Sequence, residues 1–125
     1  MVKNDLNKIK INKIIIFSPN WIGDTVISTA LVSSIKKELP LSSIVIAANK
    51  YVYPLWEANS LVKEVWGCEM RGPAYFISYL KFIFRLKKNH FDLAIILPHC
   101  FRYAFFAFCS GIPLRVAYNV GYRKV

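Results

Sequence analysis

Short apolar runs alternate along the chain with longer segments in which apolar residues recur every three or four positions. The apolar runs cover residues 13–17, 43–48, 61–66, 92–97 and 114–118. Runs of this length between Pro, Gly and Asn are typical of buried parallel strands. Helical spacing covers the intervening residues 25–39, 51–58, 74–88 and 101–109. The alternation therefore predicts an α/β fold with a doubly wound parallel sheet.

Local signals predict where several of these elements end. The helix over 25–39 has Lys36 and Lys37 in its last turn and Pro40 directly after it, which is a helix stop signal. Pro54 interrupts the short helix over 51–58, and Gly67 closes the third strand. The apolar residues with helical spacing in the first helix are Val26, Ile27, Ala30, Leu31 and Ile35.

Charge is the compositional feature that bears on partners. The 125 residues have a net charge of +10, and from Lys81 onwards eight cationic residues stand against Asp92 alone. Such a field favours anionic partners, which are nucleic acid, an anionic membrane or a phosphorylated substrate. A charge excess that only improves solubility is the alternative. We expect residues 1–12 to form a basic N-terminal extension and residues 13–125 to form one domain.

The chain shows neither a secretory signal peptide nor an apolar stretch of the ~18 residues needed to span a membrane. Its 55% apolar composition excludes a disordered tail. The three cysteines lack metal-ligand spacing, so we interpret them as reduced thiols that fill the core of a cytoplasmic protein. The sequence thus predicts a soluble or peripheral protein.

The most informative loop follows the first strand and reads Ser18-Pro19-Asn20-Trp21-Ile22-Gly23-Asp24-Thr25. Open α/β sheets bind ligands at the carboxyl ends of their strands. The loop has a single glycine, so it is neither the dinucleotide-binding fingerprint nor a P-loop. No metal-ligand cluster and no Ser-His-acid grouping is visible. Asp24 is the remaining candidate for chemistry; alternatively, it only caps a helix that begins at Thr25.

Three segments in order carry a resemblance to a known family. They are Ser-Pro-Asn-Trp-Ile-Gly-Asp-Thr-Val from Ser18, Leu-Pro-His-Cys-Phe-Arg from Leu97, and Ser-Gly-Ile-Pro-Leu-Arg-Val-Ala-Tyr from Ser110. Together they resemble the N-terminal half of the glycosyltransferase family 9 enzymes, nearest to the ADP-heptose:lipopolysaccharide heptosyltransferase II type. The resemblance implies a Rossmann-like domain, the N-terminal and acceptor-side half of a GT-B glycosyltransferase. It also implies that a C-terminal donor domain is absent from these 125 residues.

The resemblance implies an inverting, metal-independent transfer of heptose from ADP-heptose, without a cofactor, to the lipid A–Kdo/heptose inner core of lipopolysaccharide. Asp24 aligns with the proposed general base. Asn20 would bind the sugar by hydrogen bonding, and Gly23 would let the backbone approach it. Trp21 would cover a sugar face or serve only as a packing lid. Arg102 would bind an acceptor phosphate or carboxylate, or be a solvated first-turn residue.

Two other interpretations stay open. The chain is a non-catalytic basic module that binds anionic lipid, or it is a truncated, inactive gene product; no nucleic-acid recognition motif appears. The helix over 74–88 is apolar around most of its circumference. We expect one flank, with Ile77 and Phe84, to contact the cytoplasmic face of the inner membrane. Alternatively, this helix is buried on two sides or is covered by the missing domain. The resemblance implies that the isolated chain is inactive.

Overall fold

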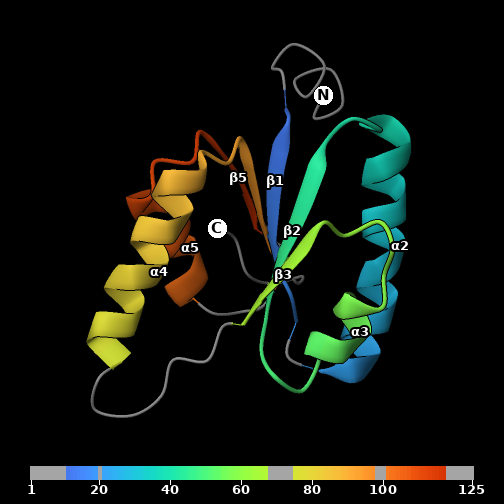
Figure 1. Cartoon of the computed structure of the whole chain (residues 1–125), viewed down its shortest axis with the longest axis horizontal. Coiled ribbons are helices and arrows are strands. Elements are labelled where there is room, and N and C mark those ends of the chain that lie inside the picture. Colours follow the sequence, from blue (N-terminus) through green and yellow to red (C-terminus); the bar gives the residue numbers. More distant parts are fainter. Residues whose placement is uncertain (1–10, 20, 68–74, 98–100, 118–125) are drawn as a thin grey trace, which may run out of the picture.

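A central parallel sheet with helices on both faces forms the protein (Figure 1). The computed structural model describes residues 11–19, 21–67, 75–97 and 101–117, with only the backbone at 75–76 and 101–104. The strands are β1 (Lys13–Phe17), β2 (Ser43–Ala48), β3 (Glu64–Gly67), β4 (Leu93–Ile96) and β5 (Leu114–Ala117). The helices are α2 (Ile22–Glu38), α3 (Tyr53–Glu57), α4 (Tyr75–Asn89) and α5 (Phe101–Cys109).

The strand order is β3-β2-β1-β4-β5, and every neighbouring pair is parallel. Ile15 in the central strand lies opposite Val45 of β2 and Ala94 of β4. The chain moves outward from β1 to β3 and then crosses to the other side of β1. This order confirms the predicted doubly wound, Rossmann-like sheet, and the direction of winding reverses between β1 and β4.

Alternate residues of β1 build two separate cores. Ile14 and Ile16 pack on the face that α2 and α3 cover, whereas Ile15 and Phe17 pack on the face of α4 and α5. Figure 1 shows these helix pairs on opposite sides of the sheet. All four side chains are fully buried, as expected for a strand covered on both faces, so the strand contains no alternation of apolar and polar residues.

The prediction for the start of α2 was wrong. The helix begins at Ile22 instead of Thr25, because the amide N–H of Thr25 already donates an intrahelical hydrogen bond of 2.9 Å to the carbonyl of Trp21. The apolar residues with helical spacing are not the fully buried residues of α2. Thr25 and Val32 are buried, whereas Val26 and Ile27 are exposed.

Three smaller boundaries also differ from the predictions. Pro54 lies in the first turn of α3, where its missing N–H costs nothing, so it starts the helix and does not interrupt it. β3 begins at Glu64 and includes Gly67, because the carbonyl of Asn59 accepts the Val62 N–H in a preceding turn. β4 covers Leu93–Ile96 and is shorter than predicted by one residue at each end. Cys109 is an exposed free thiol, not a core residue; the other two cysteines lie outside the described residues.

Within the described residues, none of the helices combines the length and apolarity that crossing a bilayer requires.

Candidate functional site

The candidate site lies at the carboxyl edge of the sheet, beyond the ends of the neighbouring strands β1 and β4. The segments that follow these two strands lead to opposite faces of the sheet. The loop after β1 leads into α2 on one face, and the segment after β4 leads into α5 on the other. The two strands stay joined to their ends, since the Leu97 N–H donates to the carbonyl of Phe17 at 3.2 Å. This topological switch point is the position at which open α/β sheets bind ligands.

The loop between β1 and α2 is fixed to the neighbouring elements by Ser18. Its amide N–H donates to the carbonyl of Ala47 in β2 at 2.9 Å. Its Oγ accepts a 2.7 Å hydrogen bond from Nε1 of Trp56 and donates to the carbonyl of Pro19 at 2.9 Å. Ser18 and Trp56 are both buried. The start of the loop is therefore held by the core and not by solvent contacts.

Thr25 fixes the other end of the loop. Its side chain is fully buried, and Oγ1 lies 2.8 Å from the carbonyl of Trp21 and 3.3 Å from that of Pro19. These contacts tie the first turn of α2 back onto the loop. The side chains of Trp21, Ile22 and Asp24, which precede Thr25 in this turn, are exposed to solvent.

Asp24 is one of those exposed residues, and it lies in the first turn of α2. It is not the helix N-cap that the sequence suggested as an alternative; Trp21 occupies that position and makes no side-chain capping bond. Within the described part of the chain, no group donates a hydrogen bond to the Asp24 carboxylate. The positive end of the helix dipole favours its negative charge. The carboxylate is therefore open to a hydrogen bond from a bound molecule.

Trp21 and Gly23 lie on the same turn as Asp24. The Trp21 side chain is 74% exposed, so its indole is not a lid over the core. At Gly23 the position of a Cβ atom would be in open space, and the backbone is helical. No described residue requires a glycine there, and the backbone at Gly23 is open to solvent.

The structure describes neither the Asn20 residue nor the Arg102 side chain, both of which were predicted for the site. Asn20 is outside the described residues. Arg102 lies in the first turn of α5, beside the carboxyl end of β4, but only its backbone is described. The backbones of Asp24 and Arg102 therefore lie at the same edge of the sheet, in the first turns of the two helices that flank the switch point.

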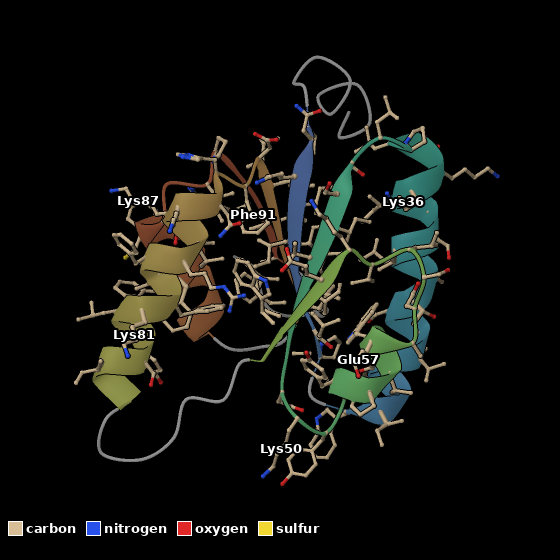
Figure 2. The ribbon with its side chains drawn as sticks, in the orientation of Figure 1. Lys36, Lys50, Glu57, Lys81, Lys87 and Phe91 are labelled. Carbon is tan, nitrogen blue, oxygen red and sulfur yellow. The ribbon has the colours of Figure 1, made fainter. Side chains whose placement is uncertain are left out.

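A cavity of about 360 Å³ lies at the same edge of the sheet, beside the carboxyl ends of β2 and β3. It is lined by Lys50, Tyr53, Pro54 and Gly67. Figure 2 shows Lys50 beyond the carboxyl end of β2, at the edge of the molecule. Its Nζ lies 5.4 Å from the ring centre of Tyr51. The sequence analysis did not identify Lys50 and Tyr53, although Lys50 lies only two residues after the end of a buried strand, which was a usable signal.

Metal ligands are a separate question for this edge. Over the residues whose placement is described, His, Cys, Asp and Glu form no group of three that could hold a metal ion.

The chain is similar in sequence to curated heptosyltransferases. It is 31% identical over 111 residues to the lipooligosaccharide heptosyltransferase 2 of Haemophilus ducreyi, covering 89% of this chain and 31% of that protein. It is 27% identical over 108 residues to the lipopolysaccharide heptosyltransferase 2 of Escherichia coli, covering 86% of this chain and 31% of that protein. The chain thus spans about a third of the length of these relatives. No protein-family model matches it.

Two solved structures share the fold. The Escherichia coli ADP-heptose lipopolysaccharide heptosyltransferase II matches with a TM-score of 0.73 and 27% identity, over 84% of this chain and 30% of that one. A glycosyltransferase of family 9 from Veillonella parvula matches with a TM-score of 0.70 and 17% identity, over 86% of this chain and 32% of that one. The second match concerns the fold alone.

Proposed function

We propose that the chain is the acceptor-binding part of a heptosyltransferase of glycosyltransferase family 9, because it is similar to heptosyltransferases over about a third of their length. The reaction would transfer heptose from ADP-heptose to the inner core of lipopolysaccharide. The observation that carries this proposal is the exposed Asp24 carboxylate in the first turn of α2, at the switch point of the sheet.

Asp24 would act as the general base. Its carboxylate takes the proton from an acceptor hydroxyl while the oxygen of that hydroxyl forms a bond to the anomeric carbon of the donor. The bond from this carbon to the ADP oxygen breaks, ADP leaves with the electron pair, and attack from the opposite side inverts the configuration. No step calls for a metal ion in this proposal. The hydrogen bonds of Ser18 to Trp56 and of Thr25 to Trp21 support the positioning that such a transfer requires.

The acceptor would lie along the carboxyl edge of the sheet. Trp21 offers an exposed ring for the apolar face of a sugar, and the open space at Gly23 permits close backbone approach. Asn20 and Arg102 would contribute hydrogen bonds from the two sides. Lys50 in the neighbouring cavity would bind a carboxylate or phosphate of the lipid A–Kdo/heptose acceptor.

The donor would be held mainly by a part of the protein outside these 125 residues, the C-terminal domain of a two-domain GT-B enzyme. The lipid anchor of the acceptor would place the reaction at the cytoplasmic face of the inner membrane.

Substitution of Asp24 tests the proposal. In the protein expressed from its natural gene with all adjoining coding sequence, Asp24→Asn should lower ADP release from ADP-heptose by about a hundredfold or more. Acceptor KM should change little, because the amide retains the hydrogen-bonding shape. Glu57→Gln is the matched control, since it removes an exposed carboxylate from a different helix, α3 (Figure 2). Near-normal turnover by Asp24→Asn would remove this residue from the mechanism.

A further inference from the structure

The outer face of α4 carries a stripe of exposed apolar side chains. Ile77, Leu80 and Phe84 are 56%, 53% and 69% exposed. They are spaced three and four residues apart, so they lie on one side of the helix. Isolated exposed apolar residues are common on proteins, but three on one helix face form a continuous patch.

The opposite face of α4 already packs on the protein. Phe82 and Leu86 are buried, and the ring centre of Phe82 lies 6.0 Å from that of Phe17 and 5.5 Å from that of Phe106. The alternative that α4 is buried on two sides is therefore wrong for the described structure. The stripe faces away from the sheet.

Cationic residues flank the stripe. At about 100° per residue, Lys81 and Lys88 lie along one flank of the stripe and Lys87 lies along the other. All three lysines are exposed. Figure 2 shows Lys81 and Lys87 on α4, on the side of the molecule away from the sheet. Arg85 differs from these lysines, because its guanidinium carbon lies 3.8 Å from the ring centre of Trp66.

Within α4 itself, no acidic side chain offsets these charges. Residues 75–91 contain no Asp or Glu. The next acidic residue along the chain, Asp92, is engaged elsewhere: its carboxylate accepts the backbone N–H groups of Asn12 and Lys13 at 2.9 and 3.1 Å. The face of α4 is thus apolar along its centre and positive on both flanks.

We propose that this face docks on an anionic phospholipid bilayer, with Ile77, Leu80 and Phe84 at the acyl boundary and the lysines on the headgroups. An apolar stripe flanked by lysines is the pattern of helices that lie in the membrane interface. Charge complementarity selects this occupant over a second copy of the chain, because a symmetric contact through α4 would place lysines against lysines. The proposal goes beyond heptosyl transfer, since the docking needs neither donor nor acceptor.

Vesicle flotation tests the docking without any sugar substrate. The protein from its natural gene is mixed with vesicles of phosphatidylcholine and phosphatidylglycerol in equal parts, or of phosphatidylcholine alone. It should float with the first and not with the second. Lys81→Glu/Lys87→Glu should lower the partition coefficient about twentyfold or more, since each lysine near an anionic surface contributes about fivefold.

Lys37→Glu/Lys63→Glu is the matched control, with the same change of charge on exposed residues outside α4 and with one lysine likewise in the last turn of a helix. It should bind almost as the unmodified protein does. Phe84→Ser should weaken binding about tenfold without any change of charge. Equal loss in the two charge variants, or no binding to anionic vesicles, would overturn the proposal and leave a protein surface as the occupant of this face. Neither result would bear on the role of Asp24.

Discussion

Nε1 of Trp56 donates a 2.7 Å hydrogen bond to Oγ of Ser18, which joins α3 to the loop that follows β1. The two residues are 38 positions apart in the sequence, and both are buried. Ser18 in turn holds the backbone that leads to Asp24. Through this bond, a core residue of a five-residue helix helps to fix the position of the candidate base.

We predict that Trp56→Phe lowers the free energy of unfolding by ~1–3 kcal/mol, because a buried hydrogen bond is lost and a small cavity forms. Urea denaturation measures the change. Glu57→Gln on the same helix should alter it by less than ~0.5 kcal/mol, as is usual for an exposed position. A Trp56→Phe protein as stable as the unmodified one would show that the bond does not hold the loop.

Gly23 allows a prediction in which stability and activity change in opposite directions. A methyl group at this helical position meets no described atom, so Gly23→Ala should stabilise the fold by ~0.5–1 kcal/mol. Heptosyl transfer should fall, because the methyl group occupies the space proposed for the sugar. Thermal unfolding and ADP release measured on the same sample separate the two effects. Full activity would show that no ligand approaches the backbone here.

Lys50 should affect acceptor affinity without affecting the chemical step. Lys50→Met keeps most of the side-chain stem and removes the charge beside the cavity. We expect acceptor KM to rise about tenfold at unchanged kcat, which corresponds to ~1.4 kcal/mol of uniform binding. Initial rates at varied acceptor concentration give both constants. Lys63→Met serves as the comparison at another exposed position, and an equal KM for the two variants would contradict an anion site at Lys50.

The sequence predicted the sheet well, because strands such as β1 are buried on both faces and therefore read as uninterrupted apolar runs. The start of α2 could not be predicted in the same way. Its first turn is decided by the buried hydroxyl of Thr25, which reaches the carbonyls of Pro19 and Trp21. The side of α2 that faces the sheet could not be predicted either. Apolar residues lie on both sides of this helix: Val32 is buried and Ile27 is exposed.

The candidate site was only partly predictable for a related reason. Asp24 could be singled out because it follows a strand along the chain. Lys50 and Tyr53 join the same edge through the pairing of β1 with β2 and of β2 with β3. That order of strands is a tertiary property, and it is not contained in the spacing of residues along one segment.

The exposed fifth strand has a consequence for the behaviour of the protein at high concentration. β5 lies at one end of the strand order, and three of its four residues are exposed. Such a strand offers its backbone groups to other molecules and is a route to aggregation, which a charged side chain opposes. Arg115 supplies that charge from a fixed position: its Nη1 donates to the carbonyl of Ile112 at 2.8 Å, and its guanidinium carbon lies 5.3 Å from the ring centre of Phe108. Where two copies of the described chain meet along β5, the like charges of Arg115 repel each other and oppose pairing of the two strands.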